Sequence, residues 1–308
     1  FDTDIATRGN HIFQYNYSHD NEGGFFMEMG RLQDGINIVR YNISQNDKRN
    51  GWSGNTMNIS GDTNLIYNNV FYNDLGIGFK IRENPKTTFL NNIFYVTDSS
   101  EPYASAPKYY YNAFYGQAAP LHGVNNIVGD PGFVNPGTAV DGIGTVDGYK
   151  LKPDSPLIGA GKVIANNGGR DFWNNPLYTG TADIGAYEDP NSTIADNVAP
   201  AAPTAVHVKE FTDSTVTLSW EAEEDGIPLD ADIYDAATDT TVASALIANE
   251  ATVTGLTPGT EYHFYVVARD RAGNPSAPSG EVQVTTLTSV TVDDVDATFV
   301  GNWTAATG

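Results

Sequence analysis

The chain has 308 residues, which is enough for two domains that each bury a core of ordinary size. Its 38 acidic and 16 basic residues give a net charge of −22, which argues against a nucleic-acid partner and an anionic membrane surface. With no cysteine, the chain has no disulfide or thiolate metal site, and no apolar run approaches the roughly 20 residues of a membrane-spanning helix.

A short pattern recurs through the first half of the chain. It is centred on an asparagine and returns every 20 to 27 residues, at Asn16, Asn42, Asn69, Asn92 and, more faintly, Asn112. Each period holds two or three short strand-like stretches separated by Asn, Gly and Asp, which is typical of a solenoid. We therefore expect an all-β fold that begins with a right-handed parallel β-helix, in which the stacked asparagines are structural.

Three strand-like stretches in this region align around Glu28, Asn58 and Lys80. Alternation of the side chains puts these three residues on one face and their apolar neighbours on the other. In stacked strands about 4.8 Å apart, the acid, amide and amine would form one outward row along a groove. A groove that repeats at this step suits a polymer, so we expect a polysaccharide as the partner of a monomeric protein.

Two insertions interrupt the expected rungs. Residues 47–54 include Arg49 and Trp52, and residues 97–110 are rich in Ser, Pro and Tyr. Insertions in solenoids gather on the face that binds ligands. We also expect earlier rungs and an export signal outside the sequence, because the chain opens within the repeat. The rungs themselves are expected at residues 11–34, 35–62, 63–85 and from 86 onward.

The pattern changes after the repeats. DPGF at 130–133, LKPDSPLIGAG at 151–161 and DIGAYE at 183–188 resemble the closing rungs of many secreted bacterial β-helix proteins. The resemblance implies a cap on the coil and a secreted or cell-surface, extracellular protein. We place the β-helix and its cap at residues 1–190 and a Pro/Ala-rich linker at 191–203.

Residues 204–288 contain strands at the spacing of a β-sandwich. VTLSW, followed by VTGLTPGTEYHFYVVARDRAGNPSAPS, resembles a fibronectin type III domain, which implies that Trp220 lies in the core and that Leu256 and Tyr262 form a tyrosine corner. The last residues, from 289 to 308, contain VDD at 292–294 followed by GNW at 301–303. This pattern resembles the start of the carbohydrate-binding-type domain of golvesin and xanthan-lyase proteins.

Hydrolysis by a pair of carboxylates is the first hypothesis for function, because the candidate groups are mainly acids. Glu28 with Asp20, Glu22 or Asp47 could flank a glycosidic bond, and their separation would decide between retention at about 5 Å and inversion at about 6.5–9.5 Å. The alternative role of Glu28 is a surface ion pair with Lys80 or Arg82. The predicted site residues are Glu28, Asp47 and Lys80 for catalysis, and Asn58, Arg82, Trp52, Asp20, Glu22 and Arg49 for substrate binding.

Elimination on a uronate polymer is the second hypothesis. Lys80 has the chemistry of a base and Arg82 that of a group that neutralises the uronate carboxylate. SHDNEGGF at 18–25 and GIGFKI at 76–81 resemble pectate lyases of the β-helix kind, which implies a calcium site and a lysine base. Where those enzymes carry several aspartates, this chain has Glu-Gly-Gly at 22–24, so metal ligands are not assigned and calcium is the candidate cofactor of this alternative.

A non-catalytic carbohydrate-binding protein or adhesin is the third hypothesis. A phage spike or a surface adhesin can show the same repeated asparagines without a catalytic acid and base. Product analysis separates the three hypotheses. Unsaturated products would indicate elimination, reducing ends alone would indicate hydrolysis, and neither would indicate binding without catalysis.

Overall fold

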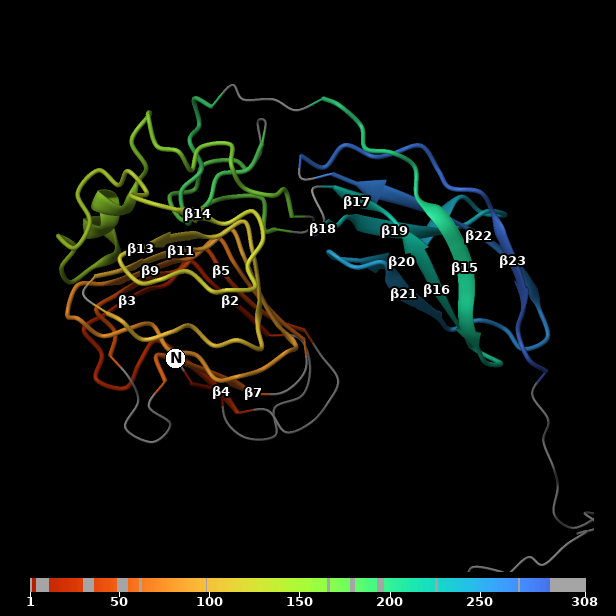
Figure 1. Cartoon of the computed structure of the whole chain (residues 1–308), viewed down its shortest axis with the longest axis horizontal. Helices are drawn as coiled ribbons and strands as arrows, with labels where there is room; N and C mark the ends of the chain where they lie inside the picture. Colours follow the sequence, from red (N-terminus) through yellow and green to blue (C-terminus); the bar gives the residue numbers. More distant parts are fainter. Residues whose placement is uncertain are drawn as a thin grey trace, which may run out of the picture. The chain divides into compact units, whose positions relative to one another are not determined.

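The computed structural model describes residues 2–3, 11–29, 36–48, 55–60, 63–97, 99–164, 167–177, 181–192, 197–224, 227–270 and 272–288. Two compact units divide the chain, residues 1–198 with 271–274 and residues 199–270 with 275–308. Strands dominate both units (Figure 1), and the described part also has a 3-10 helix, η1 (Ile143–Tyr149). No helix in the described part is long and apolar enough to span a bilayer.

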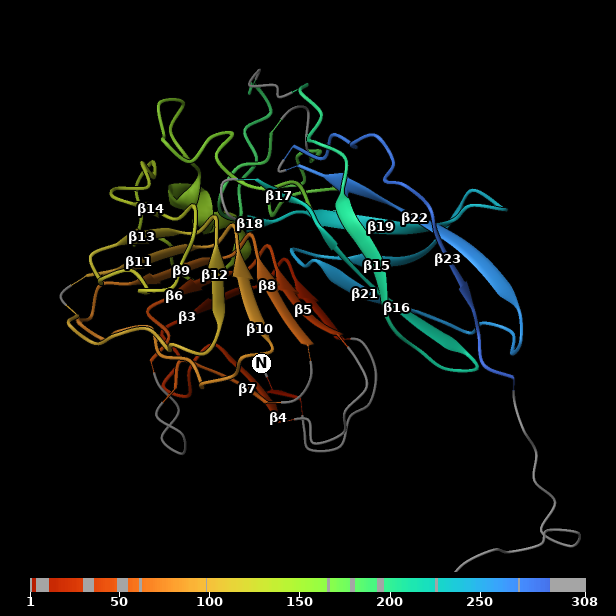
Figure 2. The ribbon, with the colours of Figure 1, turned by 45° about the vertical axis from the view of Figure 1, so that its right-hand side comes forward.

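The first unit is a β-solenoid of stacked coils with three parallel sheets (Figure 1 and Figure 2). Sheet A contains β1 (Asp2–Thr3), β4 (Phe26–Met29) and β7 (Met57–Ser60). Sheet B contains β2 (His11–Gln14), β5 (Ile36–Arg40), β8 (Thr63–Tyr67), β10 (Thr87–Leu90) and β12 (Lys108–Tyr110). Sheet C contains β3 (Tyr17–His19), β6 (Ile43–Gln45), β9 (Val70–Asn73), β11 (Ile93–Val96), β13 (Ala113–Tyr115) and β14 (Ile127–Val128).

Two residues connect each strand of sheet B to the next strand of sheet C. The first residue of this turn has a left-handed backbone, which reverses the chain direction within a short distance and which asparagine tolerates better than most residues. The same conformation recurs before β14. The φ angles are 59° at Tyr15, 49° at Tyr41, 51° at Asn68, 54° at Asn91, 53° at Tyr111 and 52° at Asn125.

The second turn residue is always an asparagine, and together they form the asparagine ladder (Asn16, Asn42, Asn69, Asn92, Asn112 and Asn126). From Asn42 to Asn126, each side-chain oxygen accepts two hydrogen bonds from the asparagine of the preceding rung. For example, the backbone N and Nδ2 of Asn42 donate to Oδ1 of Asn69 at 3.0 and 2.9 Å. Because Asn69 is fully buried, these bonds satisfy polar groups that water does not reach. The structural role predicted for the repeated asparagines is confirmed.

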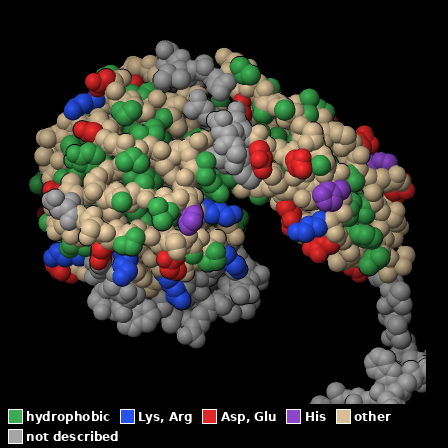
Figure 3. Space-filling view, in the orientation of Figure 1, with side chains coloured by type: hydrophobic (Ala, Val, Ile, Leu, Met, Phe, Trp, Pro, Cys, Tyr) green, Lys and Arg blue, Asp and Glu red, His purple; other side chains and the backbone are tan. Residues whose placement is uncertain are grey.

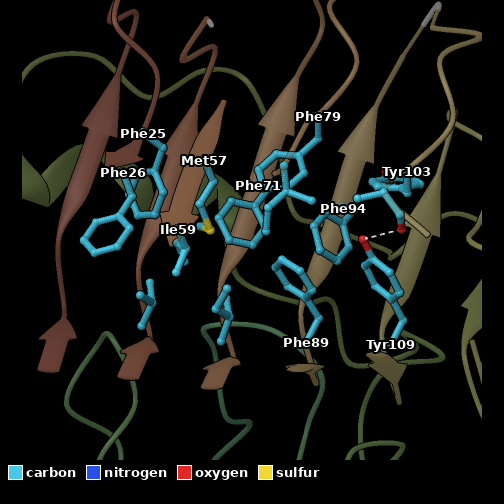
Figure 4. Packing of buried hydrophobic residues seen from close by; sticks show 14 of the residues in the cluster. Phe25, Phe26, Met57, Ile59, Phe71, Phe79, Phe89, Phe94, Tyr103 and Tyr109 are labelled. Atoms are coloured by element: carbon cyan, nitrogen blue, oxygen red, sulfur yellow. Dashed lines mark hydrogen bonds between the residues drawn. The ribbon is translucent and has the colours of Figure 1, made fainter. Parts of the chain in front are cut away.

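Aromatic side chains fill the interior of the coil between the sheets (Figure 4). Phe71, Phe94 and Phe114 occupy the same place in successive rungs, and their rings stack at centroid distances of 5.1 and 5.0 Å. Met57 and Phe79 pack against this column from the side of sheet A. The repeat therefore supplies one continuous core, as expected for a solenoid.

The register of sheet A differs from the row predicted for Glu28, Asn58 and Lys80. Glu28 pairs with Ile59, and Asn58 pairs with Met27. A shift of one residue moves a side chain to the opposite face of a strand, so Glu28 and Asn58 do not share a column. The predicted row is wrong because apolar residues occupy both faces around Glu28, and alternation alone does not fix the register there.

The closing segment (residues 129–188) lies along the outer face of sheet C and makes a second core with it (Figure 1). Ile184 is fully buried in this core, together with Val70 and Ile93 of the sheet. The segment reaches back to the first rung, where the hydroxyl of Tyr15 donates to the carbonyl oxygen of Arg170 at 3.0 Å. The predicted cap therefore covers a side of the coil, because sheet C presents an apolar outer face as well as an apolar inner one.

The second unit is a β-sandwich. One sheet contains β15 (Thr204–Phe211), β16 (Thr215–Glu221) and β21 (Glu250–Thr254). The other contains β19 (Asp230–Asp235), β20 (Thr240–Ala245), β22 (Glu261–Arg269) and β23 (Val282–Thr285), and β17 (Glu223–Glu224) pairs with β18 (Ile227–Pro228). Trp220 is 2% exposed in the core, and the hydroxyl of Tyr262 accepts a hydrogen bond from the backbone N of Thr257 at 2.9 Å, beside Leu256. The core tryptophan and the tyrosine corner are confirmed.

Candidate functional site

Two of the predicted site residues, Arg49 and Trp52, lie outside the described residues, as does the segment 289–308. Glu28 lies in β4, but its side chain is also outside the described part. Asn58 is 1% exposed, which leaves no surface for a substrate to contact. These placements give no support to a groove along sheet A.

The predicted carboxylates that are described do not form a pair across a groove. Asp47 is 2% exposed and accepts hydrogen bonds from the hydroxyl of Ser44 at 2.7 Å and from Nδ2 of Asn21 at 2.8 Å. Asp20 and Glu22 are exposed, and Glu22 makes an ion pair with a lysine of the next rung. Asp47 thus ties two rungs together, and the other two acids lie on the surface.

The predicted cations Lys80 and Arg82 are both exposed. They flank Ile81, which forms a parallel bridge to Met57 and so extends sheet A by one more rung. The backbone N of Lys80 donates to the hydroxyl of Thr56 at 3.3 Å. Within the described side chains there is no group of three or more His, Asp or Glu residues that could hold a metal, so no calcium ligands are identified.

A cleft of about 440 Å³ opens between residues 102–109 and the segment 118–122. Its walls are mostly prolines, alanines and tyrosine rings, and its polar side chains are few. The lining residues are Glu83, Pro102, Tyr103, Ala104, Ser105, Pro107, Tyr109, Ala118, Ala119, Pro120, Leu121 and His122.

Hydrogen bonds fix the shape of this cleft. The carboxylate of Glu83 accepts from the backbone N of Ser105 at 2.9 Å and of Ala106 at 2.6 Å, one to each oxygen. On the other side, Oε1 of Gln117 accepts from the backbone N of Phe79, and Nε2 of Gln117 donates to the carbonyl oxygen of Glu101 at 2.6 Å. The insertion is thereby attached to the rung before it and to the segment after it.

Two buried tyrosines form the floor (Figure 4). Tyr103 is 7% exposed and packs edge-on against Phe94 and Phe114, so the floor continues the interior core. The hydroxyl of Tyr109 donates to the carbonyl oxygen of Ala104 at 3.2 Å. Burial and the nearby carboxylate of Glu83 raise the pKa of Tyr109, so this hydroxyl stays protonated at neutral pH.

Exposed cations lie close to the lining residues in the sequence. Lys108 lies between two lining residues and is exposed, and Lys86 follows Glu83 by three positions and is also exposed. Figure 3 shows Lys and Arg side chains, with Asp and Glu between them, along the lower edge of the first unit. Among the lining residues, Glu83 supplies the one carboxylate and His122 the one imidazole. The cleft thus combines a mostly apolar lining with a few polar side chains.

Only part of this cleft was visible in the sequence. The abundance of Ser, Pro and Tyr predicted an insertion over residues 97–110, and its last part is wrong, because Lys108–Tyr110 forms β12 of sheet B. The structure places Tyr103 and Tyr109 of that stretch at the cleft. Tyr95, just before this stretch, is half-buried between the rings of Tyr72 and Tyr115. The sequence analysis missed the opposite wall at 118–122 and the hydrogen bonds from Ser105 and Ala106 to Glu83. The proline at 120 was the one residue that could have indicated a turn in that wall.

A fibronectin type III domain family model matches residues 201–285. The chain is similar to chitinase A1 of Niallia circulans, with 39% identity over 102 residues that cover 33% of this chain and 14% of that protein. It is also similar to exoglucanase B of Cellulomonas fimi, with 37% identity over 117 residues that cover 37% of this chain and 10% of that protein. The chain thus spans about a tenth to a seventh of the length of these relatives.

Among solved structures, the chain is similar to chitinase ChiA74 from Bacillus thuringiensis, with 26% identity and a TM-score of 0.25. The match covers 33% of this chain and 15% of that chain. The similarities to these enzymes concern the β-sandwich, and they leave the solenoid unmatched by the relatives named here. The predicted fibronectin type III domain is confirmed, and it occupies residues 201–285.

Proposed function

We propose that this chain is part of a secreted bacterial polysaccharide-degrading protein and that its solenoid unit binds the polysaccharide at the cleft between residues 102–109 and 118–122. The observation that carries the proposal is the cleft itself, which is about 440 Å³ in volume and is lined by rigid apolar residues with Glu83 and His122 among them. Ligand sites in proteins fall in the range of roughly 300–1,000 Å³ and are mostly apolar with a few oriented polar groups.

The likeness of the second unit to parts of chitinases and exoglucanases supports this context. In the proposed arrangement, residues 1–190 bind the sugar chain and the fibronectin type III domain is a spacer. Residues 289–308 begin a further carbohydrate-binding domain. The net charge of −22 fits a soluble extracellular monomer that binds neither nucleic acid nor anionic membrane.

Hydrolysis is the chemistry we propose for the protein. Glu28, which lies in β4 of sheet A and is not among the described residues that line the cleft, is the carboxylate to test first. Glu83 is a poor candidate, because backbone amides already donate hydrogen bonds to both of its oxygens. Replacing Glu28 by Gln should abolish the release of reducing ends, and full activity in that variant would remove Glu28 from the mechanism. Release of unsaturated products would instead favour elimination, for which Lys80 and Arg82 are exposed on one segment.

Affinity electrophoresis in gels that contain soluble polysaccharides tests the binding proposal. Ala118 is exposed and lines the cleft, so Ala118→Trp should fill the cleft with little effect on the core. Val140 is exposed and does not line the cleft, which makes Val140→Trp the matched control. We expect a polysaccharide that retards the wild type and Val140→Trp but not Ala118→Trp. Equal retardation of all three proteins would contradict binding at the cleft.

A further inference from the structure

The side chains of the inner walls offer few hydrogen-bond partners. Pro102, Pro107 and Pro120 have apolar side chains and no backbone N–H, and the side chains of Ala118 and Ala119 add only methyl groups. A bare sugar ring has hydroxyl groups on most of its carbons, and each one loses free energy if it leaves water without a new partner. An unsubstituted sugar is therefore poorly matched to these walls.

The polar groups at the cleft also argue against an acidic sugar. The acidic side chain of Glu83 lines the cleft, where the amides of Ser105 and Ala106 hold it in place, and its charge would repel a uronate. The same carboxylate has lone pairs left to accept a hydrogen bond from an N–H or hydroxyl group. His122, which is exposed, offers a second donor or acceptor for an acyl oxygen or a neighbouring hydroxyl.

We infer that the cleft binds a sugar carrying an acyl substituent, an N-acetyl or O-acetyl group, with the methyl end against the proline and alanine walls. This inference rests on the proposed function and adds the substrate class. An acetyl group has an apolar methyl end and a polar carbonyl, which matches mostly apolar wall side chains beside the polar groups of Glu83 and His122. Because Glu83 and Gln117 already hold the walls in place, binding requires little ordering of the protein.

Matched pairs of oligosaccharides test the inference by titration calorimetry on the full chain. For the N-acetyl group the pair is the tetramer of N-acetylglucosamine against the tetramer of glucose. For the O-acetyl group it is acetylated xylo-oligosaccharides against the same material after mild alkaline deacetylation. We expect the acylated member of at least one pair to bind about tenfold more tightly, which corresponds to about 1.4 kcal/mol.

Two variants locate the preference. Ala118→Trp should abolish the difference within the pair, and Leu121→Ala should reduce it, because Leu121 is 95% exposed and forms part of the wall. Val140→Trp should keep it. If both members of each pair bind the wild type with equal affinity and neither binds Ala118→Trp, the acyl inference is overturned, but polysaccharide binding at the cleft stands. Binding that neither cleft variant changes, or no binding to any oligosaccharide, would overturn both.

Discussion

Tyr103 and Tyr109 lie side by side beneath the cleft, and one hydrogen bond distinguishes them. The hydroxyl of Tyr109 donates to the carbonyl oxygen of Ala104, whereas the buried hydroxyl of Tyr103 has no partner within the described part of the chain. A buried hydroxyl without a partner costs free energy, and burial raises the pKa of Tyr103 well above its ordinary range.

Replacing each tyrosine by phenylalanine should therefore have opposite effects. We expect Tyr103→Phe to leave the free energy of unfolding unchanged or raise it by up to about 1 kcal/mol, and Tyr109→Phe to lower it by about 1 kcal/mol. Urea unfolding of the two variants, followed by circular dichroism, gives both values. A loss in Tyr103→Phe as large as that in Tyr109→Phe would show that the Tyr103 hydroxyl is hydrogen-bonded.

Residue type alone did not reveal which predicted polar residues are accessible. Asp47 and Asn58 were placed in a site because acids and amides bind sugars, but both are buried. Asp47 has the same carboxyl group as a catalytic acid. It differs from one in its surroundings, because a serine hydroxyl and an asparagine amide donate hydrogen bonds to it. Contacts between residues 26 positions apart follow from the coil, and they cannot be inferred from either residue's immediate neighbours.

At the scale of elements, the asparagine ladder is the feature that the sequence predicted best. One side chain at a fixed place in each period makes the same bonds in every rung, so the repeat in the sequence is the repeat in the structure. Sheet A was predicted less well, because Phe25, Phe26 and Met27 are apolar in a row and fit either register. The position of the closing segment depends on the outer face of sheet C, and a local pattern gives no information about that contact.

The middle of the ladder should be sensitive to substitution. Asn69 donates to the carbonyl oxygens of Val39 and Tyr67 and to Oδ1 of Asn92, each at 2.9 Å. We expect Asn69→Ala to lower the free energy of unfolding by about 3 kcal/mol or more, because it leaves several buried groups unpaired. The control is Asn126→Ala at the half-buried end of the ladder, where a loss of about 1 kcal/mol is expected. If chemical denaturation shows that Asn69→Ala and Asn126→Ala lose the same free energy of unfolding, burial does not set the contribution of each asparagine to stability.

The closing segment contains a buried carboxyl group that should make the stability of the solenoid depend on pH. Burial raises the pKa of Asp183 from 3.8 to about 6, although the backbone N–H groups of Gly159 and Asp189 donate to it at 2.7 Å each and lower the pKa. In the unfolded chain this carboxyl ionises near its ordinary pKa. Ionisation therefore costs more in the folded state, by on the order of 2–3 kcal/mol.

The solenoid should accordingly become more stable as the pH falls from 7 through 6 toward 4, and the gain should end near the unfolded-state pKa of 3.8. Unfolding free energies at several pH values test this, with Asp183→Asn as the variant in which the slope should shrink. If that variant does not fold, carbon NMR of the Asp183 carboxyl gives the pKa directly. A pKa below 4 would contradict the prediction.

At the scale of the whole molecule, each unit has its own core. The second unit buries Trp220, Phe264 and their neighbours in a cluster drawn entirely from residues 206–284. We expect a chain of residues 199–288 to fold alone and to unfold in one cooperative thermal transition, as small single domains usually do. The absence of such a transition, with the chain unfolded at room temperature, would show that the core of this unit is incomplete.

The central claim is that the polysaccharide binds in the cleft beside Glu83 and His122. The most direct test is a crystal structure of the chain soaked with the oligosaccharide that binds most tightly in calorimetry. The account predicts a sugar unit between residues 102–109 and 118–122, with its substituent against the proline walls. A sugar bound at another surface, such as sheet A or the fibronectin type III domain, with the cleft empty would contradict it.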